Sequence, residues 1–180
     1  MIRPEFRKIL MDQRGAAVIL WSFFVISIPV YIFISQRLIT ALTAGGSSFA
    51  ETVRIFVWLL ALVDLGYYVY WKRQNLSPDA ILASGKSAKL FRALADFQGE
   101  REERTAFAVS TYVTRKVVVF AIIEAIAVYG FVLAFIGGLV ADQYFLSVLS
   151  LVLLTIEFPS EKSLEAIVKA AEQPASANAA

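Results

Sequence analysis

Two acidic residues inside long apolar runs, Asp64 and Glu124, are the side chains of this sequence best suited to do chemistry. Asp64 lies seven residues before the end of its run, and Glu124 lies seven residues after the start of its own. At about 1.5 Å per residue, both would lie about 10 Å deep in adjacent antiparallel membrane helices. Because no lysine or arginine lies at that depth, we expect the two carboxyl groups to share protons, as the groups of proton relays do. Tyr67, Tyr68 and Tyr129 are the possible hydrogen-bond partners.

The same carboxyl groups also have structural explanations. A permanently protonated carboxyl can hold helices together through hydrogen bonds, and an ionised one can pair with a basic residue of another subunit. A third acidic residue, Glu157, stands near the end of the last apolar run and is expected at the membrane interface. We therefore name Glu124, Asp64 and Tyr129 as possible proton- or ion-handling residues and keep both explanations open.

Two residue types that carry much of enzyme and metal chemistry are missing from the chain, which contains no cysteine and no histidine. Without cysteine there are no disulfides, iron–sulfur clusters or thiol nucleophiles, and without histidine the commonest zinc, copper and haem ligand is absent. No nucleophile with its base and no phosphate-binding loop is visible. We predict no catalytic residue, no cofactor and no metal site, and we place an enzyme third among the possible functions.

The elements that would carry these carboxyl groups are four apolar runs. The composition, with 58% hydrophobic residues, 18% charged residues and a mean hydropathy of +0.66, is that of a membrane protein. Each run is close to the roughly 20 residues that a helix needs to cross a bilayer. They cover residues 16–35, 55–71, 117–136 and 139–158. The sequence therefore predicts an all-α, integral membrane four-helix bundle, organised as a first helix pair (16–71) and a second helix pair (117–158).

The distribution of lysine and arginine predicts the orientation of these helices. Four of the 17 basic residues lie in segment 1–15, nine in the loop 72–116 and two in segment 159–180, whereas the other side holds only Arg37 and Arg54. The positive-inside rule therefore places both termini and the long loop in the cytoplasm. A bacterial inner membrane is consistent with the compact loops. The net charge of +2 gives no reason to expect nucleic acid as a partner.

The cytoplasmic loop 72–116 contains amphipathic segments. Ser77, Pro78 and Asp79 read as an N-cap, a first-turn proline and a first-turn acid, and Gly85 would end that short helix. The next segment places an apolar stripe beside basic residues, which fits a helix lying on the anionic membrane surface or packing on a partner protein. The stripe consists of Leu90, Phe91, Leu94 and Phe97, and the basic residues are Lys86, Lys89 and Arg92.

Two further segments outside the runs have simpler predictions. Residues 100–104 carry charges of both signs and should form a solvated helical stretch that leads into the third run. After the fourth run, Pro159 and Ser160 should open an amphipathic surface helix, and residues 173–180 are expected to be a disordered tail. The helix would present Leu164, Ile167, Val168 and Ala171 on one face.

Residues 121–135 resemble the ion-carrying helix of the proteolipid (subunit c) proteins of rotary ATPases. In that family a glutamate is followed a few residues later by an aromatic residue and a glycine, which here are Glu124, Tyr129 and Gly130. The resemblance implies that Glu124 carries a proton or a sodium ion. It also implies two helices joined by a cytoplasmic loop, in agreement with the predicted direction of the runs.

Two functions from different classes follow from these observations. The aromatic-rich spans, the amphipathic surface helices and the lack of a cofactor site favour a small accessory or assembly subunit of a larger membrane protein complex. The alternative is a proton- or cation-translocating subunit that uses Glu124 and Asp64. The partners expected in either case are the lipid bilayer and other membrane protein subunits.

Overall fold

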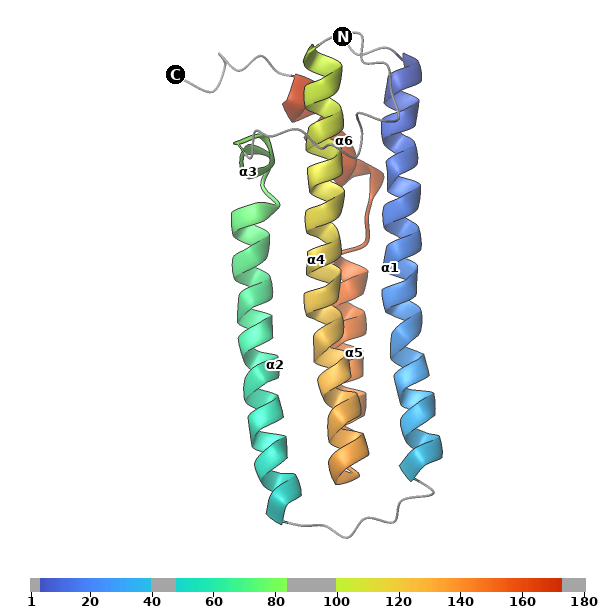
Figure 1. The fold of residues 1–180 in the computed structure, drawn as a ribbon, viewed down its shortest axis with the longest axis vertical. Helices are drawn as coiled ribbons and strands as arrows, with labels where there is room; N and C mark the ends of the chain where they lie inside the picture. The colour runs from blue at the N-terminus through green and yellow to red at the C-terminus, as the bar shows by residue number, and fades with distance from the viewer. Residues whose placement is uncertain (1–3, 40–47, 84–99, 173–180) are drawn as a thin grey trace. The chain divides into compact units, whose positions relative to one another are not determined.

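The computed structural model describes residues 4–39, 48–83 and 100–172, and every regular element in these ranges is a helix (Figure 1). The prediction of an all-α chain is confirmed, since the described residues contain no strand. The helices are α1 (Pro4–Ile39), α2 (Ser48–Asn75), α3 (Pro78–Ala83), α4 (Glu100–Gly137), α5 (Val140–Ile156) and α6 (Glu161–Glu172).

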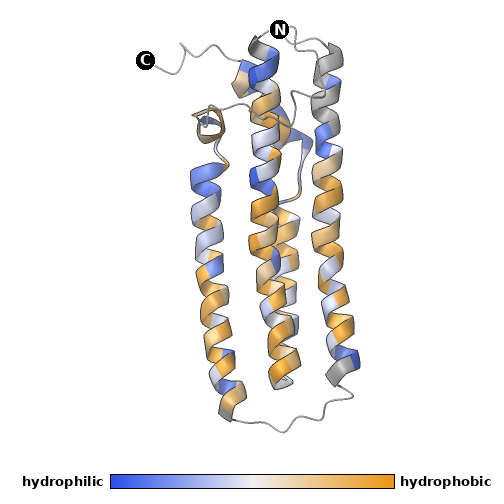
Figure 2. Cartoon of the chain, viewed as in Figure 1, coloured by the Kyte–Doolittle hydropathy of each residue, from blue (hydrophilic) through white to orange (hydrophobic). Residues whose placement is uncertain are grey.

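Three of these helices are long and apolar enough to cross a membrane, through their segments Gln13–Arg37, Phe49–Asn75 and Glu102–Gly137. Helix α5 with its 17 residues is the fourth candidate when it is taken together with α6, from which it is bent by 47°. Figure 2 shows the apolar character of the middle of α1, α2 and α4 and of most of α5. Helices of this length and apolar character indicate an integral membrane protein with three or four candidate spans.

The chain divides into two compact units. We call unit 1 the residues Met1–Ile19, Lys72–Val117 and Pro159–Ala180, and unit 2 the residues Leu20–Trp71 and Val118–Phe158. Helices α1, α2 and α4 contribute residues to both units. The two units are described separately below.

Unit 1 has an apolar core of side chains from α3, α4 and α6. The residues that α6 contributes are the four predicted to share one face, and each of them is at most 4% exposed. That prediction is confirmed, and the face is covered by the chain itself. The cluster consists of Ile81, Ala106, Ala108, Val109, Tyr112, Leu164, Ile167, Val168 and Ala171.

Two helix starts in unit 1 follow from local side-chain hydrogen bonds. Ser77 Oγ accepts the N–H of Ala80 at 3.2 Å, which is the N-cap predicted for α3. Ser160 caps α6 in the same way, because its Oγ accepts the N–H of Ser163 at 3.3 Å. The charged stretch 100–104 opens α4 as predicted, but Glu102 in it is 7% exposed, so the expectation that the stretch is solvated is wrong at this residue. Gly85, the amphipathic stretch 86–97 and the tail 173–180 lie outside the described residues.

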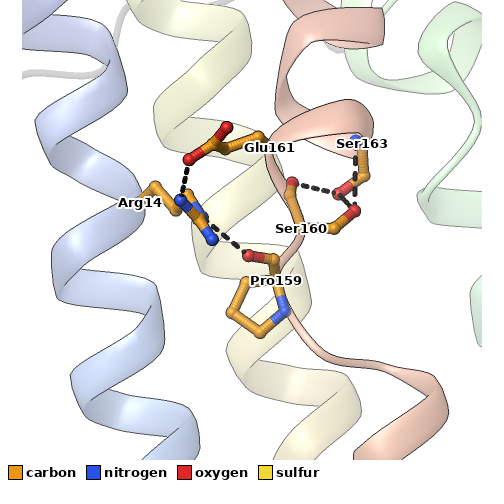
Figure 3. Close-up of polar contacts among 5 residues, drawn as sticks. All are labelled: Arg14, Pro159, Ser160, Glu161 and Ser163. Carbon is orange, nitrogen blue, oxygen red and sulfur yellow. Dashed lines mark hydrogen bonds and ion pairs between the residues drawn. The ribbon is translucent and has the colours of Figure 1, made fainter.

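A contact of Arg14 holds the start of α6 against α1 within unit 1 (Figure 3). The Arg14 side chain forms an ion pair with Glu161, and its Nε donates to the carbonyl oxygen of Pro159 at 3.1 Å. Arg14 is the last basic residue before the first apolar run. Its guanidinium group therefore joins two segments that are far apart in the sequence.

Unit 2 contains parts of α1, α2 and α4 together with α5 (Figure 1). Side chains of α1 and of α2 each form hydrogen bonds with side chains of α4 and α5. An apolar cluster joins α2, α4 and α5 through Val57, Ala61, Ile126, Leu133 and Leu146. Helix α4 approaches α5 closely at Gly130, where an added Cβ would meet the Cα of Gln143 at 3.0 Å. Small residues permit such close backbone contact between membrane helices.

The connection from α4 to α5 depends on a glycine. Gly138 has a φ of 65°, a left-handed conformation that a residue with a Cβ adopts only at a cost. Its N–H still bonds the carbonyl oxygen of Ala134 at 3.0 Å, so that α4 ends without an unsatisfied backbone group at this position. The chain then enters α5 within two residues.

Candidate polar site in unit 2

Glu124 lies on α4 and accepts two hydrogen bonds from α1. The hydroxyl of Ser27 donates to Glu124 Oε1 at 2.6 Å, and the hydroxyl of Tyr31 donates to the same oxygen at 2.8 Å. Ser27 and Tyr31 are four residues apart, so they lie on one face of α1. The carboxyl group therefore ties α1 to α4 by two hydrogen bonds.

The polar contacts continue from Tyr31 to α5. Gln143 donates from Nε2 to the backbone carbonyl of Tyr31 at 3.2 Å, and its Oε1 accepts the hydroxyl of Ser35 at 2.6 Å. Gln143 is 1% exposed and Ser35 is fully buried. Together, Ser27, Tyr31, Ser35, Glu124 and Gln143 form what we call the polar seam, a row of hydrogen-bonded groups between α1, α4 and α5.

Asp64 on α2 has a different partner, the hydroxyl of Tyr129, which donates to Asp64 Oδ2 at 2.7 Å. Tyr129 lies five residues after Glu124, a rotation of about 140° around α4. Glu124 therefore points to α1, whereas Tyr129 points to α2. The expected contact between the two carboxyl groups is replaced by separate contacts of each with hydroxyl groups of a neighbouring helix.

Glu157 is buried, with 2% of its surface accessible, and its expected position at the membrane interface stays a prediction. The hydroxyl of Tyr68 donates a hydrogen bond to Glu157 Oε1 at 2.5 Å, whereas the hydrogen bond to Asp64 comes from Tyr129. Tyr67 packs its ring against Trp71, with 5.9 Å between the centroids. Of the three tyrosines considered from the sequence, Tyr129 is the one that contacts Asp64.

A fourth acidic residue of unit 2, Asp142, was not identified from the sequence. It is 5% exposed and lies in the first turn of α5. Its Oδ1 accepts hydrogen bonds from Trp58 Nε1 at 2.8 Å and from Arg54 Nε at 3.1 Å, and it forms an ion pair with Arg54. This group joins α5 to the first half of α2 through an ion pair and two hydrogen bonds.

The polar periodicity of two helices would have indicated the seam. Ser27, Tyr31 and Ser35 follow one another at intervals of four residues on α1. On α5 the polar residues Gln143, Ser147 and Ser150 also share one face and are all at most 1% exposed. In an apolar run such a stripe marks the face that packs on other helices, because polar groups avoid lipid.

The chemistry available in unit 2 is that of carboxyl, hydroxyl and amide groups. Such groups can hold or exchange protons, or bind a cation through oxygen atoms. Within residues 4–39, 48–83 and 100–172, no group of three or more acidic, histidine or cysteine residues is arranged to hold a metal ion. Glu124, Asp64 and Tyr129 are thus placed in two separate hydrogen-bonded contacts.

The chain matches no protein-family model, no curated protein and no solved structure. The short resemblance of residues 121–135 to rotary ATPase proteolipids is therefore not extended by these comparisons to any larger part of the chain. The function has to be argued from the geometry of the two units.

Proposed function

We propose that the protein is an accessory or assembly subunit of a larger membrane protein complex. The observation that carries the proposal is the way unit 2 uses its acidic side chains. Asp64, Glu124, Asp142 and Glu157 each accept a hydrogen bond from a neighbouring helix. Carboxyl groups held in this way act as fixed contacts between helices, which suits a structural subunit.

The outward faces of unit 2 support the same proposal. Helices α1 and α2 expose large apolar side chains, including Phe23 (68% exposed), Phe33 (58%), Phe56 (63%) and Val63 (65%). These faces have to contact either lipid tails or helices of other subunits. A small protein that presents such faces on two helices is suited to bridge larger membrane proteins.

The proposal is tested by the native mass of the protein after its extraction from its own membrane in a mild detergent. A complex with a fixed stoichiometry of different subunits is expected, and mass spectrometry of its components would name the partners. A monomer would contradict the proposal. A closed ring of identical subunits would also contradict it and would favour the proteolipid-like alternative.

We further propose a four-helix bundle with both termini in the cytoplasm, in a bacterial inner membrane. The asymmetry of lysine and arginine supports this orientation. The chain contains no cysteine, so single-cysteine variants can be labelled specifically. An impermeant maleimide should label Ala166→Cys only in inside-out vesicles and Glu51→Cys only in right-side-out vesicles, since both positions are exposed. The opposite result would reverse the orientation, and labelling of both from one side would exclude it.

The second candidate function is proton or cation translocation, with Glu124 as the carrier and Asp64 and Tyr129 as further ion-handling residues. The polar seam favours it, because Tyr31 contacts Glu124 through its hydroxyl and Gln143 through its carbonyl group. Transport by the reconstituted protein should then be lost in Glu124→Gln and kept in the control Glu51→Gln, whose side chain is exposed. Unchanged transport in Glu124→Gln would rule out this carrier.

A further inference from the structure

Among the four acidic residues of unit 2 that accept a hydrogen bond from a neighbouring helix, Asp64 is the one whose described contacts satisfy its carboxyl group least. Its Oδ2 accepts one hydrogen bond, from Tyr129, and the side chain is partly exposed. In the described part of the chain, no lysine or arginine forms an ion pair with it. Asp142, by contrast, is 5% exposed and has both Arg54 and Trp58 as donors.

The surroundings of Asp64 place it at the border of an outward face of α2. Its neighbours along this side of the helix, at positions −4, −1 and +3, are Leu60 (37% exposed), Val63 (65%) and Tyr67 (44%). We call these four residues the Asp64 face. On the other flank of Asp64, Val57 at position −7 and Ala61 at position −3 are buried in the cluster with α4 and α5. The carboxyl group therefore lies where α2 meets whatever covers unit 2 from outside.

We propose that the Asp64 face binds a transmembrane helix of a different protein that carries a lysine or arginine at the depth of Asp64. Ionisable side chains within membranes almost always face other helices and pair with an opposite charge. A basic residue could reach the carboxyl oxygen that Tyr129 leaves free. The ring of Tyr67 and the side chains of Leu60 and Val63 would pack against the apolar part of the same helix.

A second copy of this chain does not fit the face. None of the four apolar runs, 16–35, 55–71, 117–136 and 139–158, contains a lysine or arginine. A symmetric contact would also place one Asp64 against another, which is unfavourable when both are ionised. Lipid alone would leave the carboxyl group beside hydrocarbon with Tyr129 as its partner. The charge of Asp64 therefore favours a basic helix from another chain.

This inference rests on the proposed accessory function, and it names the kind of partner and the surface that holds it. The test uses the full-length protein, labelled with a fluorophore at Ala166→Cys and reconstituted in phosphatidylcholine vesicles. The probes are two synthetic leucine–alanine helices that span the bilayer and carry an acceptor dye. One has a single lysine at the depth of Asp64, and the other has leucine at that position.

Energy transfer should show that the lysine helix associates about tenfold more strongly than the leucine helix with the protein that retains Asp64. Asp64→Asn should remove this preference, because it keeps an acceptor for Tyr129 but loses the charge. Two controls should retain it: Glu51→Gln, in which the charge of an exposed carboxyl of α2 is removed, and Leu62→Ala, on the exposed side of α2 away from the Asp64 face.

Equal association of the two helices with the Asp64 protein would overturn the inference and leave lipid as the cover of the face. A preference that survives in Asp64→Asn would overturn it as well. Either failure is distinct from failure of the accessory function, which is judged by the native mass of the complex. A hetero-complex that forms without any preference for the lysine helix would mean that the partners bind elsewhere on the protein.

Discussion

Unit 1 buries the apolar side chains of its helix α6, whereas unit 2 exposes many of its large apolar side chains. In unit 1 the apolar face of α6 points inward, with Leu164 2% and Val168 1% exposed, whereas Lys162 and Lys169 are exposed. In unit 2 many large apolar side chains point outward, and Gln143 and Glu157 are among the buried residues. Figure 2 shows the corresponding change from mixed colouring on α6 to apolar colouring on α5.

This difference indicates which interactions stabilise each unit. In water, burial of the apolar face of α6 removes apolar surface from the solvent and is favourable. In a bilayer that driving force is absent between helices, so close packing and hydrogen bonds have to hold them. The contacts of Glu124 with Ser27 and Tyr31 are of this second kind. A charge placed in the apolar core should therefore be damaging in unit 1. Added volume between helices or the loss of a hydrogen bond should be damaging in unit 2.

The largest effect is expected from a charge placed in the core of unit 1. Ile167→Asp should lower the free energy of unfolding by about 3–5 kcal/mol and detach α6. The side chain of Ile167 is 4% exposed, so the substitution would bury an unpaired carboxylate. Hydrogen exchange of the α6 amides should become fast, while that of α5 stays slow. The control Ala166→Asp adds the same charge at an exposed neighbouring position and should leave α6 protected. Slow exchange in Ile167→Asp would show that the apolar cluster does not hold α6.

In unit 2 the largest effect is expected from added volume between α4 and α5. Gly130→Leu should cost about 1–3 kcal/mol, because a Cβ at Gly130 already meets the backbone of Gln143 at 3.0 Å. Gly66→Leu is the matched control, since an added Cβ there meets no atom within 4 Å. Thermal unfolding in detergent should show a lowered Tm for Gly130→Leu only. Equal Tm values for the two variants would contradict the close α4–α5 contact.

A smaller loss should follow when Glu124 loses one of its donors. Tyr31→Phe removes the hydroxyl that donates to Glu124 and should lower the free energy of unfolding by about 0.6–1.7 kcal/mol, the range for hydrogen bonds in membrane proteins. Tyr70→Phe, at a position that is 59% exposed, should leave it unchanged. Denaturant titration in mixed micelles measures both. Identical curves would show that the hydrogen bond from Tyr31 contributes nothing to stability.

The smallest effects are expected from two serines on the buried face of α5. Ser150 donates to the carbonyl oxygen of Ile123 at 2.9 Å, so Ser150→Ala should cost about 0.6 kcal/mol. The hydroxyl of Ser147 is buried without a hydrogen-bond partner, so Ser147→Ala should be neutral or stabilising. The same titration compares them. A larger loss for Ser147→Ala than for Ser150→Ala would mean that the hydroxyl of Ser147 has a partner after all.

The sequence by itself determined the helical class of the chain and its place in a membrane. Long apolar runs and the absence of strand-like alternation are properties of neighbouring residues, so they can be read along the chain. The start of α3 at Ser77 and Pro78 and the shared face of α6 are local in the same sense. The spacing of Asp64 and Glu124 within their runs likewise predicted that acidic groups lie among the helices.

Only the tertiary structure decided which groups meet. Tyr68 contacts Glu157 and Tyr129 contacts Asp64, although the sequence offered both tyrosines equally. Glu124 is held by α1, which lies about a hundred residues earlier in the chain. The rotation of each helix about its axis and its register against its neighbours set these pairs. Both depend on packing between segments distant in sequence, such as the close approach of α5 at Gly130, and no local pattern encodes them.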